Sequence, residues 1–229
     1  MNASETDMAQ ARQRMVAEQI VGRGIRDEAI IAAMAEVPRD AFVEPRYREF
    51  AYEDGPLPIP AEQTISQPYV VALMIQALEL HPEDKVLEVG TGSGYAAAVL
   101  SRIVREVHTV ERLKKLVAFA RQNLATVGYD NVHVHHSDGT TGWARAAPYE
   151  AIVVAAGGPH VPEPLKAQLT IGGRLVIPIG SAPRAQQLVR VTRVGPDDYK
   201  ERHLGHVRFV PLIGSEGWDR DSTRRRGFF

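Results

Sequence analysis

The chain of 229 residues contains no cysteine. That absence excludes disulfide bonds, cysteine nucleophiles, cysteine-ligated zinc and iron–sulfur clusters. Charge of either sign is not in excess, because 27 Lys and Arg stand against 28 Asp and Glu. No global basic field is therefore present to attract nucleic acid or anionic lipid. A run of about 18 apolar residues is also missing, and segment 1–10 is polar and acidic, so we expect a cytoplasmic protein without membrane or nucleic-acid partners.

The first 80 residues are expected to form helices and an arm on the substrate side of the molecule. Apolar side chains recur at helical spacing in segments 8–21, 27–37 and 68–80. Asp27 is the expected N-cap of the second helix. Prolines are frequent between residues 42 and 60 and forbid long regular elements there. This stretch is therefore expected to be an ordered loop or a surface arm.

From residue 85 onward, strands and helices alternate. The expected strands are 85–89, 106–110, 132–136, 151–155 and 174–179, with helices at 95–104, 113–127 and 162–169. Such βα repeats indicate a parallel sheet covered on both faces, with ligands at the carboxyl ends of the strands. Segments 187–193 and 200–211 are expected to add an antiparallel hairpin at the sheet edge. We predict a Rossmann-like, doubly wound, mostly parallel seven-stranded sheet in 81–218 and a mobile basic tail in 219–229, within a single compact unit.

Three alternate glycines follow the first strand, where residues 86–95 read Val-Leu-Glu-Val-Gly-Thr-Gly-Ser-Gly-Tyr. Glycine lets the backbone turn sharply and approach a ligand at the start of a helix. A dinucleotide fingerprint requires glycine or alanine where Tyr95 stands, and a ring there is expected to obstruct the close approach of helix and strand. Glu88 is expected to place an anion beside the loop, which favours a cationic ligand over a diphosphate.

Acidic side chains follow the next two strands. Glu111 lies about 20 residues past the glycine loop, where a carboxylate accepts hydrogen bonds from both hydroxyls of a ribose. Asp138 is expected to accept the exocyclic amino group of adenine, while Gly139 makes room for the ring. Each motif alone is weak. The ordered set at successive strand ends resembles the class I methyltransferases that use S-adenosyl-L-methionine, over about residues 80–180.

A more specific resemblance lies ahead of the glycine loop, in residues 51–59 and 63–69. The sequence Thr64-Ile65-Ser66-Gln67-Pro68 and its surroundings look like those of protein-L-isoaspartate (D-aspartate) O-methyltransferases. Further similar segments are 15–20, 23–25, 37–39, 42–43, 147–149, 168–169, 172–176 and 207–212. The resemblance thus covers about residues 15–212. It is interrupted at 60–62, Pro-Ala-Glu, where members of the family often carry a glycine-containing linker.

The resemblance implies methyl transfer from S-adenosyl-L-methionine to the free α-carboxyl group of L-isoaspartyl residues in damaged proteins and peptides, with S-adenosyl-L-homocysteine as the product. The acceptor is already ionised at neutral pH, so no general base is required. Ser66 is the expected catalytic residue, as a hydrogen-bond donor that orients the acceptor. The expected cofactor-binding residues are Gln63, Thr64, Ile65, Glu88, Gly90, Thr91, Gly92, Ser93, Gly94, Glu111, Arg112, Asp138 and Gly139.

Plainer interpretations stay open for several of these residues. Ser66 also suits the N-cap of the helix that Pro68 opens, and Asp138 suits an ordinary Asp-Gly turn. His133 and His135 share one face of a strand, which is a reason to consider a metal. We expect no metal, because no set of carboxylate and histidine ligands at suitable spacing accompanies them.

Other functions also stay open. They are a methyltransferase for another small carboxylate or amine, a non-catalytic homologue that binds the cofactor, and an NAD-dependent dehydrogenase. Methyltransferases that act on base amino groups use an Asn/Asp-Pro-Pro-Tyr type loop after the fourth strand, whereas residues 154–158 are small and apolar here. We expect a monomer.

Overall fold

The computed structural model describes residues 3–182 and 185–219. The strands of its main sheet are β3 (Lys85–Val89), β4 (Glu106–Glu111), β5 (Val132–His136), β6 (Tyr149–Val154), β7 (Leu169–Ala182), β8 (Ala185–Arg193) and β9 (Tyr199–Val207). Their spatial order is β5-β4-β3-β6-β7-β8-β9. The pairs from β5 to β7 are parallel, and β8 and β9 continue the sheet antiparallel. The predicted mostly parallel, seven-stranded fold with a hairpin at its edge is confirmed.

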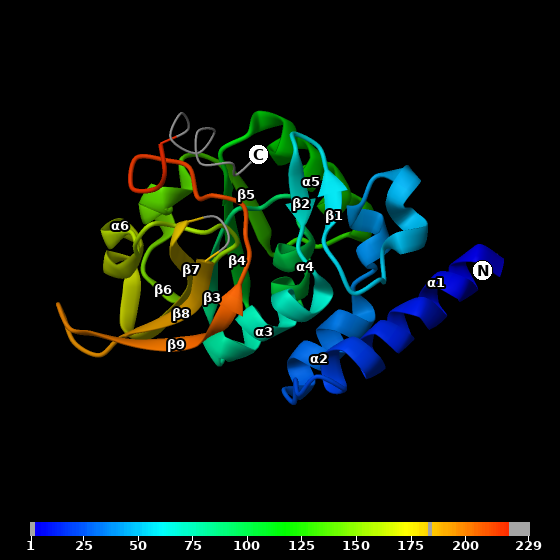
Figure 1. The fold of residues 1–229 in the computed structure, drawn as a ribbon, viewed down its shortest axis with the longest axis horizontal. Helices are drawn as coiled ribbons and strands as arrows, with labels where there is room; N and C mark the ends of the chain where they lie inside the picture. Colours follow the sequence, from blue (N-terminus) through cyan, green and yellow to red (C-terminus); the bar gives the residue numbers. More distant parts are fainter. Residues whose placement is uncertain (1–2, 183–184, 220–229) are drawn as a thin grey trace.

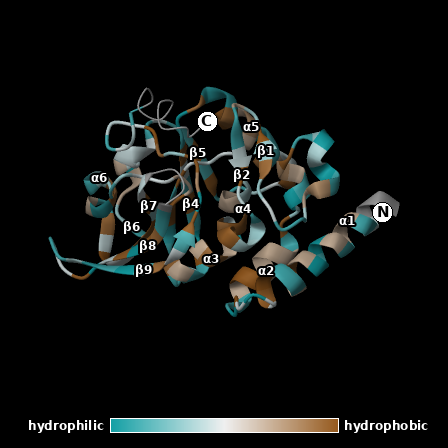
Figure 2. Cartoon of the chain, viewed as in Figure 1, coloured by the Kyte–Doolittle hydropathy of each residue, from teal (hydrophilic) through white to brown (hydrophobic). Residues whose placement is uncertain are grey.

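Helices cover both faces of this sheet (Figure 1). The helices are α1 (Ala3–Arg14), α2 (Glu28–Glu36), α3 (Pro68–Leu78), α4 (Tyr95–Ser101), α5 (Lys114–Val127) and α6 (Glu163–Ala167), and a π-helical turn, Met15–Val21, continues α1. Alternate strand residues face opposite layers. Val86 packs with the helices that include α3, α4 and α5, whereas Leu87 packs on the side of α6. Figure 2 shows the resulting apolar interior and a mainly hydrophilic α1.

The N-terminal helices share their core with the sheet. Buried residues from Met15 to Leu188 form one contiguous cluster, which contains Ile30 and Met34 of α2. The Asp27 carboxylate accepts hydrogen bonds from the amides of Ala29 and Ile30, so the predicted N-cap is confirmed. None of the helices within 3–182 and 185–219 is long and apolar enough to cross a bilayer.

The proline-rich arm contains short elements that periodicity did not predict. They are 3₁₀ turns at Arg39–Phe42 and Pro45–Phe50 and a two-stranded sheet of β1 (Leu57–Ile59) and β2 (Gln63–Ile65). Three-residue strands are too short to give an alternating pattern. The turn between β1 and β2 places Ala61 and Glu62 at φ of 60° and 59°, a region that favours glycine. In the segment 60–62, which departs from the family pattern, Ala61 and Glu62 therefore adopt a backbone conformation that glycine adopts more easily.

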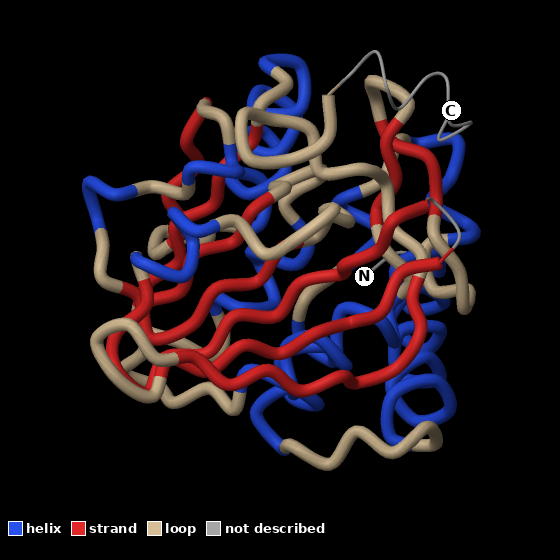
Figure 3. The backbone as a smooth tube through the Cα atoms, turned by 60° about the vertical axis from the view of Figure 1, so that its left-hand side comes forward, coloured by secondary structure: helices blue, strands red, loops and turns tan. Residues whose placement is uncertain are grey.

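Several boundaries differ from their sequence-based predictions. α4 ends three residues early and α6 spans only Glu163–Ala167. The turn expected at Gly172-Gly173 lies inside β7, where an irregularity in the pairing with β6 absorbs the additional residues. Figure 3 shows the long strands of β7, β8 and β9 side by side. Of the predicted mobile tail, residues 220–229 lie outside the described residues.

Candidate functional site

A cavity opens at the carboxyl ends of β3, β4 and β6. Its empty volume is about 950 Å³ when the open mouth is included. Among the sequence-predicted site residues, those that line it are Gln63, Thr64, Ile65, Ser66, Glu88, Gly90, Thr91, Gly92, Ser93, Glu111, Arg112 and Gly139. Gly94 and Asp138 do not line it. The fold thus joins residues 63–66 and the glycine loop, which are 24 or more positions apart, in one wall.

The glycine loop turns through three left-handed residues. Gly90, Gly92 and Gly94 have φ of 97°, 55° and 91°, where a side chain is unfavourable. A Cβ on Gly94 would lie 3.2 Å from Cγ of Leu124 in α5. Gly94 therefore allows α4 and α5 to pack closely, although it does not contact the cavity.

Tyr95 does not obstruct the approach of helix and strand, so that expectation was wrong. Its ring is buried and packs edge-to-face on Phe42, with ring centroids 5.7 Å apart. Its hydroxyl donates to Met34 Sδ at 3.6 Å. The side chain points from the start of α4 into the N-terminal helices, which the sequence pattern of the loop alone did not reveal. Tyr95 thus anchors the helical extension beside the cavity.

Glu111 lies at the end of β4 with its carboxylate buried in the cavity wall. The amide of Gly92 donates to its Oε2 at 3.2 Å, and the amide of Leu113 donates to its Oε1 at 2.9 Å. Each carboxylate oxygen has capacity for a further hydrogen bond. The side chain is therefore held rigidly and can still accept from two hydroxyl groups.

Glu88 is buried at the end of β3, where Thr109 Oγ1 donates to its Oε2 at 2.6 Å. Burial raises the pKa of Glu88 to about 8, and the nearby Glu111 carboxylate adds to the rise, whereas the Thr109 hydrogen bond opposes it. A pKa of about 8 favours the neutral acid at pH 7. The expectation of an anion beside the glycine loop is therefore wrong, because desolvation outweighs the hydrogen bond from Thr109.

A pH-dependent stability is expected from Glu88. Its folded-state pKa lies above the unfolded value of 4.5, so unfolding releases a proton between about pH 4.5 and pH 8. The free energy of unfolding should fall through this range by at most about 1.4 kcal/mol per pH unit and then level off. Glu88→Gln, which keeps an acceptor for Thr109, should remove this component. Urea unfolding of both proteins from pH 5 to pH 9 measures it, and superimposable profiles would contradict the assignment.

Asp138 is occupied by protein partners. The amide and hydroxyl of Thr140 donate to its Oδ1 at 2.9 and 2.7 Å, and the amide of Ser215 donates to its Oδ2 at 2.8 Å. Burial alone would raise the pKa of Asp138, but the hydrogen bonds from Ser215 and Thr140 hold it below the ordinary value. In this geometry the side chain caps a 3₁₀ turn and holds the chain near 215, which differs from the expected acceptor position for adenine. Gly139 does line the cavity, but the space of its missing side chain is filled by Val89, whose Cγ1 would lie 2.6 Å from a Cβ.

Ser66 follows β2 directly and lines the cavity. Its hydroxyl makes no hydrogen bond to any of the residues that the structure describes. The N-cap of α3 is Gln67, and no side chain caps that helix, so the interpretation of Ser66 as an N-cap is wrong. Gln67 instead donates to Asp54 at 2.7 Å, which in turn pairs with Arg23 at 3.1 Å. These contacts hold the chain in place on one side of Ser66. The Ser66 hydroxyl can therefore bind a ligand in the cavity.

The remaining cavity wall comes from residues that the sequence motifs did not identify as ligand contacts. Val210–Ile213 and Ala155-Ala156 line it. The two segments are joined because the amide of Gly157 donates to Val210 O at 2.8 Å and the amide of Leu212 donates to Gly157 O at 2.9 Å. Small apolar side chains without a chemical signature carry no recognisable motif. Only family resemblance pointed to 208–212.

The premise that His133 has no ligand partners was also wrong. Glu106, His108 and His133 come together on β4 and β5, with one ligand atom of each within 4.8 Å of the others. None of them lines the cavity described above. The sequence pattern of β5 alone did not reveal this cluster, because Glu106 and His108 belong to the neighbouring strand β4.

The chain is similar in sequence to protein-L-isoaspartate O-methyltransferases over most of its length. It is 61% identical to the protein-L-isoaspartate O-methyltransferase 2 of Pelobacter propionicus, over 90% of this chain and 92% of that protein. It is also 61% identical to a protein-L-isoaspartate O-methyltransferase of Rhodopseudomonas palustris, over 93% of this chain and 97% of the relative.

Solved structures agree with the sequence comparison. A protein-L-isoaspartate O-methyltransferase matches 93% of this chain and 69% of its own with a TM-score of 0.82 and 31% identity. A Plasmodium falciparum protein, provisionally described as such an enzyme and crystallised with S-adenosyl-L-homocysteine, matches 88% of this chain and 98% of its own at a TM-score of 0.77 and 27% identity. The family model described as protein-L-isoaspartate(D-aspartate) O-methyltransferase matches residues 10–217. The chain therefore belongs to the protein-L-isoaspartate(D-aspartate) O-methyltransferase family.

Proposed function

We propose that this protein transfers a methyl group from S-adenosyl-L-methionine to the free α-carboxyl group of L-isoaspartyl residues in damaged proteins and peptides. The observation that carries the proposal is the shared cavity, which both the segment 63–66 and the glycine loop line. The first is the segment most specific to the family, and the second has the backbone geometry of a cofactor loop. Methyl transfer to a carboxylate requires both at one place, because most of the rate gain comes from holding the two reactants together.

The residues present fit the cofactor. The Glu111 carboxylate retains capacity for two ribose hydroxyls, and the turns at Gly90 and Gly92 bring bare backbone to the cavity. Apolar side chains such as Val110 and Leu116 provide a surface for an adenine ring. When bound, S-adenosyl-L-methionine supplies a methyl group activated by a positively charged sulfur. We propose that Gln63, Thr64 and Ile65 contact it from the arm, and that Arg112 and Ser93 border it.

The acceptor needs positioning rather than activation. An α-carboxyl group with a pKa of about 3.5 is ionised at neutral pH and is already nucleophilic. We propose that the free Ser66 hydroxyl donates a hydrogen bond to one carboxylate oxygen and thereby orients the other. Ala156 and Leu212 are buried and line the same cavity, so part of its wall is apolar. The proposed contribution of the protein is to orient the two reactants.

The proposal is tested by methyl incorporation from labelled S-adenosyl-L-methionine into a synthetic L-isoaspartyl peptide. The matched control is the same peptide with a normal aspartyl residue. We expect labelling of the isoaspartyl peptide alone, as a methyl ester that is lost in mild base. Equal labelling of both peptides would favour a methyltransferase for other carboxylates. Binding of the cofactor without labelling of either peptide would favour a non-catalytic homologue.

A further inference from the structure

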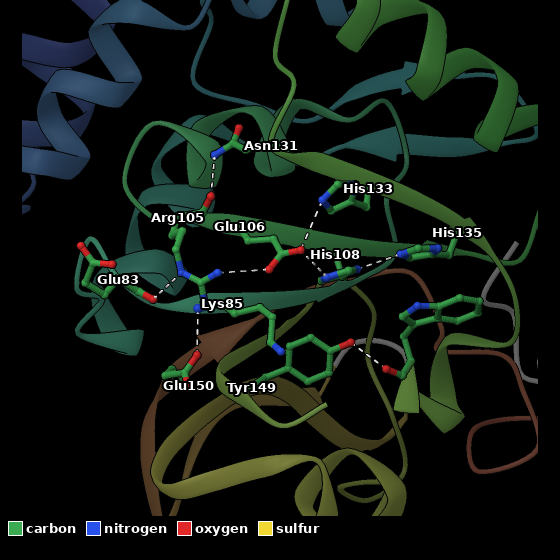
Figure 4. A network of polar contacts seen from close by, with 11 residues as sticks. Glu83, Lys85, Arg105, Glu106, His108, Asn131, His133, His135, Tyr149 and Glu150 are labelled. Carbon is green, nitrogen blue, oxygen red and sulfur yellow. Dashed lines mark hydrogen bonds and ion pairs between the residues drawn. The ribbon is translucent and has the colours of Figure 1, made fainter. Parts of the chain in front are cut away.

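Two imidazoles and one carboxylate converge on β4 and β5 (Figure 4), and none of the three residues lines the cavity. His108 Nε2 lies 3.1 Å from Glu106 Oε1, and His133 Nε2 lies 3.3 Å from the same oxygen. The rings of His108 and His133 have their centroids 5.0 Å apart. All three candidate ligand atoms lie within 4.8 Å of one another.

The parallel pairing of β4 and β5 explains this convergence. His108 stands opposite His133 in the register, so both side chains lie on one face of the sheet. Glu106 is two residues before His108 and therefore projects from the same face. The three groups thus stand on two neighbouring backbones whose spacing the sheet holds constant. A site on strands is better defined than one on loops.

Neighbouring groups hold the cluster in place. His135 Nε2 lies 2.9 Å from His108 Nδ1, so one ring nitrogen of His108 is engaged and the other faces Glu106. The ring of His135 is itself stacked on Trp143, with centroids 4.1 Å apart. Arg105 contacts Oε2 of Glu106 at 3.5 Å and leaves Oε1 to the imidazoles. Such outer contacts to the second ring nitrogen and to the carboxylate are typical of metal sites.

We propose that Glu106, His108 and His133 form a binding site for a divalent transition-metal ion of the Zn²⁺ type. The ligand atoms would be Glu106 Oε1 and the Nε2 atoms of the two histidines, with water in the remaining position. Bonds of about 2.1 Å in a tetrahedral arrangement place ligand atoms about 3.4 Å apart. The separations of the two Nε2 atoms from Glu106 Oε1, 3.1 and 3.3 Å, differ from this value by a few tenths of an ångström at most, and all three ligand atoms lie within 4.8 Å of one another.

The site is separate from methyl transfer. Its residues lie in the amino-terminal halves of β4 and β5, whereas the cavity lies at the carboxyl ends of the strands, where Glu111 ends β4. A bound ion would cross-link β4 to β5, the edge strand of the sheet. The expected consequence is a more stable sheet edge, because an ion that binds only the folded state raises the stability of that state.

Besides Arg105, a second nearby cation, Lys85, opposes the ion. The Lys85 ammonium lies over the ring of Tyr149, 5.5 Å from its centroid, and that ring packs on His108 at 6.0 Å between centroids. Figure 4 shows Lys85 and Tyr149 beside the cluster. Removing this charge is therefore expected to strengthen binding, a response that a non-specific surface site elsewhere would not give.

The test is calorimetric titration of the full chain with Zn²⁺ in a non-chelating buffer. We expect a site of one ion per chain that His133→Ala weakens by about 100-fold and Glu106→Gln by about 10-fold or more. The control is His203→Ala, an exposed histidine on β9, which should bind as the unaltered chain does. Lys85→Met should tighten binding several-fold. Zn²⁺ should also raise the melting temperature of the chain and of His203→Ala, but not that of His133→Ala.

Two outcomes would overturn the proposal. One is the absence of a one-ion site in the unaltered chain. The other is equal affinity in His133→Ala and His203→Ala, which would place the ion elsewhere. Unchanged methyl transfer by His133→Ala, with cofactor affinity retained, would show that the variant is folded, so that its loss of Zn²⁺ reports on the site itself. Nitrogen NMR of the histidine rings should show Zn²⁺-dependent shifts at Nε2 of His108 and His133 in the unaltered chain.

Discussion

Ser66→Ala is expected to lower the turnover of isoaspartyl peptide by about 100-fold while the affinity for S-adenosyl-L-homocysteine stays within about threefold. Removal of one hydrogen-bond donor that is aligned with a reacting oxygen typically has this effect. The hydroxyl lines the cavity and is not used to cap α3, so its loss should not unfold the helix. Single-turnover kinetics and calorimetric titration with the cofactor product measure the two quantities separately.

The control for Ser66→Ala is the removal of a hydroxyl group that lies elsewhere in the fold. Thr126 on α5 donates to Gln122 O in an ordinary helix contact and is exposed. Thr126→Ala should therefore leave turnover and cofactor affinity unchanged. A Ser66→Ala variant that turned over as fast as Thr126→Ala would remove Ser66 from the mechanism. Equal losses of turnover and cofactor affinity in Ser66→Ala would instead assign the hydroxyl to the cofactor.

Glu111→Ala is expected to weaken the binding of S-adenosyl-L-homocysteine by 100-fold or more. Hydrogen bonds to a charged acceptor contribute about 1.5 to 3 kcal/mol each, and two ribose hydroxyls would be lost. The substitution also leaves the amides of Gly92 and Leu113 without their acceptor, so the glycine loop should lose part of its order. Calorimetric titration of the cofactor product, with a thermal melt of the free protein, separates binding from folding.

Two further variants make the Glu111 result specific. Glu111→Gln keeps one oxygen acceptor and should lose less affinity than Glu111→Ala. Glu201→Ala, an exposed carboxylate on β9, removes the same charge without a contact to the cavity and should bind as the unaltered chain does. If the Glu111→Ala variant remained folded and bound the product with an affinity within threefold of the unaltered chain, the ribose assignment would be wrong.

Local patterns were sufficient for the parts of the site that lie within one motif. The alternate glycines required left-handed backbone, and all three have it. Short segments rich in β-branched and apolar residues predicted β3 and β5 with the bounds that the structure has. The β1–β2 hairpin was missed because three residues are too few to show a period, and because Pro58 and Pro60 are otherwise signs of irregular structure.

The burial and the hydrogen-bond partners of individual side chains could not be predicted from the sequence. Glu88 is an acid beside the glycine loop, and it is buried strongly enough that its pKa rises to about 8. Asp138 is at the predicted strand end, but Thr140 and Ser215, the latter 77 residues away, occupy its oxygens. Tyr95 was misjudged for the same reason, because the pocket that accepts its ring is built by Phe42 and Met34. In each case at least one of the deciding partners is distant in the chain.

The sequence alone determined the βα alternation, the glycine loop, the acid at the end of β4 and the family, because each depends on residues that are neighbours in the chain. Only the tertiary structure decided which groups are charged, which hydroxyl is free and which strands align their side chains. Desolvation and hydrogen bonding depend on what packs against a group, and the register of β4 and β5 brings His108 beside His133 although 25 residues separate them. The cavity and the histidine cluster are likewise separate because the cavity lies at the carboxyl ends of the strands, whereas the cluster lies nearer to their amino ends.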